Sequence, residues 1–289
     1  MILILGRSGL LGQEMAWHLS KQGFRYLGTG HELDILNWDA LTNYSDCKDI
    51  RAIVNCAGYT AVDRAEAEED LAVRVNAEGP ENLARLSLRL GARLIHLSTD
   101  YVFSGTKREP YLESDAPDPV NAYGRSKAEG ETRVLAAAPD SVIVRSAWLY
   151  GRHGGNFVST MLKLMRERDS VDVVDDQHGS PTWAADLAGV LAGLAARPDL
   201  PAGIYHYSGE GQASWYGFAV EIQSLALKHG LLDRACSLRP VATSQYPRAA
   251  RRPAYSVLSQ EKIKALGFRA PPWRESLERF ILSLRGMQS

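Results

Sequence analysis

Short apolar runs alternate with amphipathic stretches along the first half of the chain. Such runs are typical of strands buried on both faces of a sheet, and the stretches between them repeat their apolar residues at helical spacing. The runs predicted to be strands are Ile2–Leu5, Phe24–Leu27, Ala52–Asn55, Arg93–Ser98 and Ser141–Arg145. Strands that alternate with helices form right-handed βαβ units, so the pattern predicts an α/β fold of the Rossmann type with a doubly wound parallel sheet.

Helices are expected between these strands, at residues 13–22, 41–45, 63–90 with a break near Gly79-Pro80, and 122–138. The second half is less regular. It is predicted to contain helices at 156–168, 183–196, 214–229, 260–266 and 273–284, strands at 171–174 and 203–208, and a linker-like stretch at 198–201. We therefore expect a dinucleotide-binding domain at residues 1–150 and a smaller, partly interleaved substrate-binding region over most of residues 151–289.

A glycine-rich loop, Gly6-Arg7-Ser8-Gly9-Leu10-Leu11-Gly12, follows the first predicted strand and opens a helix. Glycine lets backbone amides approach a pyrophosphate with no Cβ in the way, and the helix N-terminus directs free N–H groups at the phosphates. The glycine spacing differs from the common G-x-G-x-x-G pattern. The place of the loop in a βαβ unit nevertheless favours dinucleotide binding over a plain strand–helix turn.

The residues after the second predicted strand bear on the choice between NAD and NADP. In NAD-binding folds an acidic residue at this point bonds the ribose 2′-hydroxyl. This chain has no carboxylate between Leu27 and Glu32, and Arg7 or His31 could pair with a 2′-phosphate, although Arg7 can also be interpreted as a solvated loop residue. We therefore expect NADPH as the cofactor, with NADH as the alternative.

Two further stretches are expected to line the dinucleotide. Asp34-Ile35 follows the second strand and could flank the adenine. Ala57-Gly58-Tyr59-Thr60 follows the third strand, and its small residues would let the backbone meet the cofactor ribose. Ligands of this class of fold bind at the carboxyl ends of the strands, where both stretches begin.

Tyr123 and Lys127 lie four residues apart in a predicted helix, which places both side chains on one helix face. A tyrosine hydroxyl ordinarily has a pKa of about 10, and a neighbouring ammonium favours the phenolate. Such a pair can give a proton to a carbonyl or take one from a carbinol. The pair follows a predicted strand that leads into Thr99-Asp100, and the Thr99 hydroxyl could bond the same substrate oxygen.

Together these residues resemble the extended branch of the short-chain dehydrogenase/reductase superfamily, and most closely the dTDP-4-dehydrorhamnose reductase family. The resemblance covers nearly the whole chain. Besides the glycine loop, its motifs lie at residues 59–66, 75–77, 98–103, 123–127, 145–151, 156–157, 176–182, 203–206, 214–215 and 252–253. The departures are Gly58, where the family more often has alanine, and Leu10-Leu11, where many members have Gln-Val.

The resemblance implies NAD(P)H-dependent reduction of the C4 ketone of dTDP-4-dehydro-β-L-rhamnose to dTDP-β-L-rhamnose, a precursor of surface polysaccharide. It implies that Tyr123 donates the proton, that Lys127 lowers the tyrosine pKa and holds the nicotinamide ribose, and that Thr99 orients the carbonyl. It also implies that residues 182–200 return to the dinucleotide domain. It assigns to the cofactor Gly6, Arg7, Gly9, Leu10, Leu11, Gly12, Asp34, Ile35, Ala57, Gly58, Tyr59, Thr60, Tyr123 and Lys127, and to the sugar nucleotide Thr99, Asp100, Trp148, Asn156 and Arg252. Arg248 and Arg251 either share in binding the diphosphate or belong to a solvated basic loop.

Composition narrows the choice of partners. Lys and Arg total 33 and Asp and Glu total 34, a net charge of −1, which argues against a nucleic-acid-binding surface and against a polybasic membrane-binding one. No apolar run reaches about 18 residues, so no membrane span is expected. Cys47, Cys56 and Cys236 form no C-x-x-C pair, which fits the reducing cytoplasm. The histidines lack metal-binding spacing, so we expect no metal site, and the choice between monomer and homodimer stays open.

Three alternatives accompany this hypothesis. A reductase of another nucleoside-diphosphate 4-keto-6-deoxysugar would carry the same motifs and differ in pocket stereochemistry. A 4,6-dehydratase or epimerase of the same fold would resemble Thr-Asp-Glu after the fourth strand, whereas this chain has Tyr101 at the third position. A non-catalytic cofactor-binding regulatory subunit would lack the tyrosine–lysine pair, which is intact here.

Overall fold

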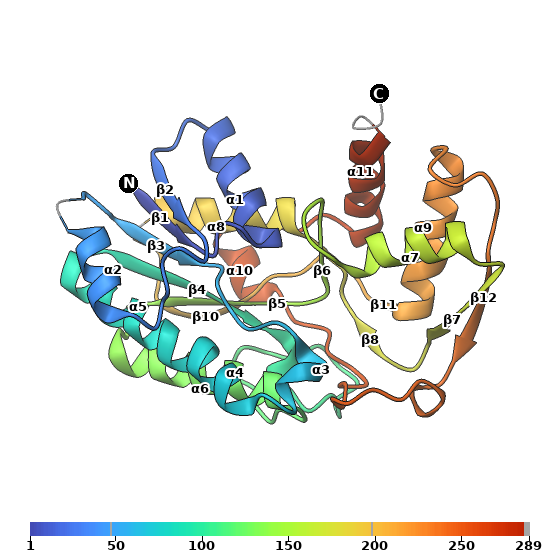
Figure 1. The fold of residues 1–289 in the computed structure, drawn as a ribbon, viewed down its shortest axis with the longest axis horizontal. Helices are drawn as coiled ribbons and strands as arrows, with labels where there is room; N and C mark the ends of the chain where they lie inside the picture. Colours follow the sequence, from blue (N-terminus) through green and yellow to red (C-terminus); the bar gives the residue numbers. More distant parts are fainter. Residues whose placement is uncertain (47, 198, 286–289) are drawn as a thin grey trace.

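The computed structural model describes residues 1–46, 48–197 and 199–285, so Cys47 and the first residue of the linker-like stretch lie outside it. A parallel sheet forms the centre of the larger of two lobes (Figure 1). Its strands follow the order β10-β5-β4-β3-β1-β2, with bounds β1 Ile2–Leu5, β2 Tyr26–Thr29, β3 Ala52–Asn55, β4 Arg93–Thr99, β5 Val142–Ser146 and β10 Gly203–His206. The strand order reverses between β1 and β3, and ligands bind at such switch points. The predicted Rossmann-type α/β fold is confirmed.

Apolar side chains cover both faces of this sheet, because successive residues of a strand point to opposite sides. Ile2 and Ile4 pack on one face, and Leu3 and Leu5 pack on the other. The first face is covered by helices α1 (Leu10–Lys21) and α8 (Ala184–Ala196), and the second by α2 (Trp38–Ser45), α5 (Gly79–Leu90) and α6 (Ala122–Ala137). Burial on both sides explains why the strands appear in the sequence as continuous apolar runs.

The smaller lobe has a separate core, in which Phe218, Trp273 and Phe280 are buried (Figure 1). Its elements are α7 (Phe157–Glu167), β7 (Ser170–Val174), α9 (Trp215–Lys228), β12 (Ser237–Val241) and α11 (Trp273–Arg285), with β7 and β12 paired in parallel. Two-residue pairs also form between β6 (Leu149–Tyr150) and β9 (Thr182–Trp183), and between β8 (His178–Gly179) and β11 (Ala213–Ser214). Between β9 and β11 the chain returns to the larger lobe, where α8 packs on α1 and β10 pairs with β5.

Two local predictions are wrong. The second strand begins at Tyr26, because Gly23 adopts a left-handed φ of 72° after α1 and the chain becomes extended only beyond Phe24. No break occurs at Gly79-Pro80, since a π-helical turn at Arg74–Glu78 leads directly into α5. Pro80 is the second residue of α5, which directly follows this turn. The predicted helical stretch is divided earlier, into α3 (Val62–Ala65) and α4 (Glu69–Val73).

The remaining short elements are the 3₁₀ turns η2 (Asp100–Val102) and η3 (Thr243–Gln245) and the helix α10 (Glu261–Ala265). Within the described ranges, no helix combines the length and the apolar character that crossing a bilayer requires.

Candidate active site

The glycine loop packs backbone against backbone at the switch point of the sheet. Gly6 has a left-handed φ of 75°, and a Cβ there would lie 2.6 Å from the backbone nitrogen of Ala57, in the loop after β3. A Cβ at Gly12 would collide with the carbonyl of Gly6. No side chain caps the N-terminus of α1 after Gly9, so the N–H groups of its first turn have no side-chain acceptor. The loop therefore fits a pyrophosphate, as the sequence predicts.

Charges of both signs stand at the end of β2. The Arg7 side chain covers Gly28, where a Cβ would collide with its methylene groups. The Glu32 carboxylate accepts the N–H of Gly30 at 2.7 Å. That bond, aided by the charges of Arg7 and His31, holds the pKa of Glu32 below its ordinary value. A ribose 2′-substituent at this point would lie near the predicted cation, Arg7, and also near the Glu32 carboxylate, whose position is not evident from the sequence.

Asp34 and Ile35 shape the loop after β2. The Asp34 carboxylate accepts the N–H of Leu36 at 2.9 Å. Ile35 is buried in the core of the sheet's second face, where a Cβ on Gly79 would collide with it. Of the two side chains predicted to flank the adenine, only that of Asp34 is exposed.

Asn76 connects the loop after β3 to the helix that carries Tyr123. It is fully buried in the π-helical turn, and its Oδ1 accepts the N–H of Tyr59 at 2.8 Å. Its Nδ2 donates to the Tyr59 carbonyl at 3.0 Å and to the Ser126 hydroxyl at 2.9 Å. Sequence reasoning used Asn76 only as part of a motif and assigned it no role. A π-helical turn inside a helix frequently marks a functional site, but it is not visible in the sequence.

Tyr123 and Thr99 meet at the carboxyl end of β4. The Thr99 hydroxyl lies near the Tyr123 phenol, and it donates to Oδ1 of Asp100 at 3.0 Å. Burial raises the pKa of Tyr123 to about 12, and the nearby Thr99 hydroxyl opposes this only in part. Burial likewise raises the pKa of Asp100 to about 6, against the opposing effects of the nearby Ser256 and Thr99 hydroxyls. The phenol therefore carries its proton at neutral pH and can donate it.

Lys127 lies one helical turn after Tyr123 and is directed at strand β4. Its Nζ donates to the Leu97 carbonyl at 2.6 Å and lies 3.4 Å from Nε2 of His96. Burial lowers the pKa of Lys127 to about 8, against the opposing effect of the Glu131 charge. In this arrangement the group that lowers the pKa of Tyr123 is Thr99, whereas Lys127 is bonded to the strand.

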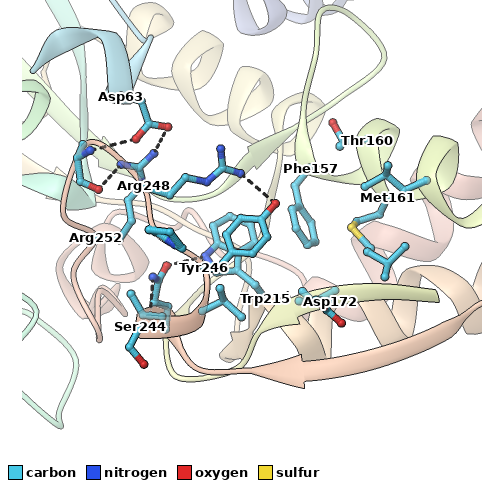
Figure 2. A pocket seen from close by; sticks show the side chains of 18 of the residues that line it. Asp63, Phe157, Thr160, Met161, Asp172, Trp215, Ser244, Tyr246, Arg248 and Arg252 are labelled. Carbon is cyan, nitrogen blue, oxygen red and sulfur yellow. Dashed lines mark hydrogen bonds and ion pairs between the residues drawn. The ribbon is translucent and has the colours of Figure 1, made fainter. Parts of the chain in front are cut away.

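A cavity of about 830 Å³ opens between the lobes next to this cluster. Its walls include Asp63 and Tyr101 from the larger lobe and Phe157, Trp215 and the segment 243–252 from the smaller lobe (Figure 2). The Tyr101 ring stands edge-on to that of Tyr123, with centroids 5.8 Å apart. The phenol is therefore separated from the cavity by one ring at most. The volume lies within the range of about 300–1,000 Å³ that is usual for small-molecule sites.

Two arginines of the cavity wall have different surroundings (Figure 2). Arg252 donates to Oδ2 of Asp63 at 3.0 Å and to the Ala250 carbonyl at 2.8 Å. Burial alone would raise the pKa of Asp63, but hydrogen bonds from Ala250 and Arg252 outweigh it and keep the pKa low. Arg248 is exposed and lies over the Tyr246 ring at 4.8 Å. Arg252 therefore fastens this segment to α3, while Arg248 presents its guanidinium to the cavity.

Trp148 stacks on Trp215 with centroids 3.5 Å apart and ring planes 4° from parallel. Its backbone has a left-handed φ of 48°, the one non-glycine residue of the described chain in that region, a conformation that costs roughly 1–2 kcal/mol. Trp215 lines the cavity, whereas Trp148 lies behind it. Sequence reasoning singled out Trp148 and used Trp215 only as part of a motif.

The side chain of Asn156 is occupied by the helix that follows it. Its Oδ1 accepts the N–H of Ser159 at 3.2 Å and its Nδ2 donates to the Gly151 carbonyl at 2.8 Å, so that it caps α7. The neighbouring Phe157 lines the cavity. Within the described ranges, no three His, Cys, Asp or Glu side chains are grouped so that they could hold a metal ion, and Cys56 and Cys236 are free thiols.

The sheet order, the glycine loop at its switch point and the pair Tyr123–Lys127 beside Thr99 define the class of the extended short-chain dehydrogenases/reductases. Residues 1–285 match the family described as the RmlD substrate binding domain, and the chain belongs to this family.

Curated relatives and solved structures agree with this membership. The chain is 40% identical over 284 residues to a dTDP-4-dehydrorhamnose reductase of Aggregatibacter actinomycetemcomitans, covering 96% of this chain and 97% of that one. It is also 40% identical over 268 residues to a dTDP-4-keto-6-deoxy-D-glucose reductase of Streptomyces niveus, covering 92% and 90%. The crystal structure of a Bacillus anthracis dTDP-4-dehydrorhamnose reductase in complex with NADP superposes with a TM-score of 0.92 at 39% identity, covering 98% of both chains.

Proposed function

We propose that this chain is an NADPH-dependent reductase that converts the C4 ketone of dTDP-4-dehydro-β-L-rhamnose into the alcohol of dTDP-β-L-rhamnose. The observation that carries the proposal is the cluster of Tyr123, Thr99 and Lys127 next to a cavity large enough for a nucleotide sugar. Relatives that bear the name of this reaction, and a structural neighbour that binds NADP, support it. NADH is the alternative cofactor, because Glu32 stands close to Arg7.

In this proposal residues 1–150 bind the dinucleotide, with 182–200 returning to that domain, and residues 151–289 mainly bind the sugar nucleotide. The N–H groups at the start of α1 would hold the pyrophosphate, and Arg7 would hold the 2′-phosphate. Ala57 to Thr60 would line the ribose, next to the glycine loop. The reduced dinucleotide, when bound, supplies the hydride for the reaction.

The chain's own contribution is a proton and an orientation. The ketone oxygen of the substrate would accept a hydrogen bond from the Tyr123 phenol, which can then transfer its proton. The Thr99 hydroxyl would be a second hydrogen-bond partner for the same oxygen. Lys127 lies one helical turn away, and exchanging its bond to Leu97 for a bond to the ribose would bring a positive charge toward the phenol. Burial of this cluster keeps water from competing for the proton.

The sugar nucleotide would occupy the cavity between the lobes. Asp100 directly precedes Tyr101, a residue of the cavity wall, and Trp215, stacked on Trp148, forms an aromatic part of that wall. We assign the diphosphate first to Arg248, whose guanidinium is exposed, and assign to Arg252 the placement of the segment that carries it. Asn156 would contribute by capping the helix that presents Phe157.

The test is oxidation of NADPH, and separately of NADH, by the purified protein with a panel of dTDP- and GDP-linked 4-keto-6-deoxysugars. We expect turnover with dTDP-4-dehydro-β-L-rhamnose and with NADPH at least as good a cofactor as NADH. Turnover with a different 4-keto sugar alone would favour the second candidate, a reductase for another sugar, which the Streptomyces niveus relative supports. No turnover with any sugar by a folded, NADPH-binding protein would contradict both.

A further inference from the structure

Two buried histidines of the larger lobe each lie 3.4 Å from a basic side chain. Nε2 of His96 faces the Nζ of Lys127, and Nε2 of His206 faces the guanidinium of Arg145. Both imidazoles are completely buried. The proposed reaction assigns a role to neither of them. Whether each Nε2 is a hydrogen-bond donor or an acceptor depends on the tautomer of the imidazole.

The hydrogen bonds of Asn55 determine which nitrogen of His96 carries the proton. The Oδ1 of Asn55 accepts the N–H of Ala57 at 3.0 Å, which fixes the orientation of the amide. The Nδ2 group of Asn55 therefore donates to Nδ1 of His96, 3.0 Å away. A neutral imidazole that accepts at Nδ1 has its N–H at Nε2, the nitrogen that faces Lys127.

His206 has the opposite tautomer. Its Nδ1 lies 3.2 Å from the Tyr111 carbonyl, which can only accept, so the proton is on Nδ1. Its Nε2 is then free to accept a hydrogen bond from Arg145. His206 therefore accepts a hydrogen bond from the Arg145 cation. His96 instead directs its Nε2–H at the Nζ of Lys127, which is also a donor when the lysine is charged.

An uncharged amine at Lys127 removes this conflict. It donates one N–H to Leu97 and accepts the Nε2–H of His96 with its lone pair. As an ammonium, Lys127 would still bond Leu97 but would face the imidazole N–H with a like donor. Burial holds the pKa of His96 well below its ordinary value, and a charge on Lys127 would lower it further. The imidazole therefore stays neutral and cannot remove the conflict by gaining a proton.

The charged groups on neighbouring elements do not supply another partner for an ammonium. On α6 the one carboxylate whose charge acts on Lys127 is Glu131, and it is held by the Arg145 fork at 2.8 and 2.6 Å. The other carboxylates near α6 have partners of their own. Glu66 of the loop after α3 bonds the N–H of Ala122, Glu69 of α4 bonds Arg125, Glu81 of α5 bonds Arg133, and Asp100 of η2 bonds Thr99. The residue that the π-helical turn buries against α6 is the uncharged Asn76.

We propose that His96 is a positioning residue for Lys127: held by Asn55 in the Nε2–H tautomer, it favours the uncharged amine of the lysine, bonded to Leu97, over the ammonium in the protein without dinucleotide. Resting on the proposed function, the consequence is that dinucleotide binding above about pH 8 takes up one proton from solvent. The ribose hydroxyls offer Lys127 acceptors that the strand lacks, and it leaves His96 as an ammonium.

The first test needs no dinucleotide. In the free protein labelled with ¹⁵N-histidine, NMR at neutral pH should show His96 as the Nε2–H tautomer and His206 as the Nδ1–H tautomer. The variants His96→Gln and His206→Gln assign the two signals by their loss. An Nδ1–H tautomer or an imidazolium at His96 would overturn the proposal, whatever the reaction of the protein.

The second test measures NADPH affinity by fluorescence between pH 6 and pH 10. In the unaltered protein the dissociation constant should rise about tenfold per pH unit above a break near the pKa of Lys127, about 8. His96→Gln offers the ammonium an amide oxygen, so the break should move up by about one pH unit. Asn55→Asp requires the proton on Nδ1 of His96 and should move the break in the same direction without altering the imidazole.

The matched control is His206→Gln, which alters the other buried histidine and should leave the break where it is. An unshifted break in folded, NADPH-binding His96→Gln and Asn55→Asp variants would overturn the positioning role and leave the reductase proposal intact. No NADPH binding by any variant or by the unaltered protein would count instead against the proposed function, and the tautomer measurement would still decide the role of His96.

Discussion

The two ends of the candidate site are built differently. At the inner end, which is next to the cavity but not part of its wall, Thr99, Asp100 and Lys127 are nearly inaccessible, and each is held by short bonds to its neighbours or to the backbone. At the outer end Arg248 is exposed and has an aromatic ring as its partner. A reaction needs groups whose positions are fixed before the substrate arrives, whereas binding of a charged ligand is favoured by an exposed side chain of opposite charge. The inner end should therefore control kcat and the outer end KM.

Removal of the Tyr123 hydroxyl should have the largest effect. We expect Tyr123→Phe to lower kcat by roughly 10²–10⁴ while NADPH binding changes little, because a positioned general acid is lost and the ring remains. Stopped-flow or steady-state oxidation of NADPH with the dTDP-4-keto sugar measures it. Tyr101→Phe is the control, since Tyr101 lines the same cavity. If Tyr101→Phe were the slower variant, the proton donor would be Tyr101.

The buried carboxyl of Asp100 should make the inner end sensitive to pH. Its pKa in the folded protein is about 6, above the ordinary value of 3.8, so between these values the folded state keeps a proton that the unfolded state has lost. The contribution of Asp100 to the free energy of unfolding therefore falls as pH rises from 4 to 6, by about 3 kcal/mol in all. Asp100→Asn should lack this slope when urea unfolding is compared at pH 4, 5, 6 and 7. If the free energy of unfolding changed with pH in the same way in both proteins, the raised pKa of Asp100 would be contradicted.

Loss of the exposed cation should act on binding alone. Arg248→Gln is expected to raise KM for the sugar nucleotide about tenfold or more with kcat unchanged, since a charge-assisted hydrogen bond contributes about 1.5–3 kcal/mol. Calorimetry with dTDP provides an independent measurement. Arg234→Gln, which removes an exposed arginine paired with Asp169 outside the cavity wall, is the matched control. A fall in kcat with KM unchanged would place Arg248 at the reacting end.

Truncation of Asn76 should lower the free energy of unfolding more than loss of Arg248 does. Asn76→Ala leaves the N–H and carbonyl of Tyr59 and the Ser126 hydroxyl without their partner, and should lower the free energy of unfolding by about 1–3 kcal/mol. Arg248→Gln should leave it within about 0.5 kcal/mol, the usual range for surface substitutions. Urea titration of both variants gives the comparison, and equal stabilities would show that the two ends do not differ in rigidity.

The sequence was informative wherever local pattern determines structure. Strands β1 and β3 begin and end as predicted, because burial on both faces produces a continuous apolar run bounded by polar residues. Strand β12 was not predicted, since Ser237 and Arg239 are exposed, Pro240 interrupts the pattern, and its partner β7 lies more than 60 residues earlier. An edge pairing of this kind depends on the tertiary fold and leaves no periodic signal.

The same distinction applies to the site. The glycine loop and the spacing of Tyr123 and Lys127 are visible in the chain because each lies within one turn and helix. The places of Asn76 and His96 depend on hydrogen bonds that span 17 to 50 residues. Arg252 was assigned to the sugar nucleotide through the resemblance, which does not show that Asp63 already bonds its guanidinium.

The stacked indoles of Trp148 and Trp215 give the protein an optical property of its own. Two tryptophan rings stacked at 3.5 Å are held in one fixed, asymmetric environment, so the pair should contribute to the circular dichroism and fluorescence of the folded protein. Because Trp215 forms part of the cavity wall, a ligand that tilts or displaces it changes these signals. Occupancy of the cavity can thus be followed in the unlabelled protein, without turnover and without a coupled dye.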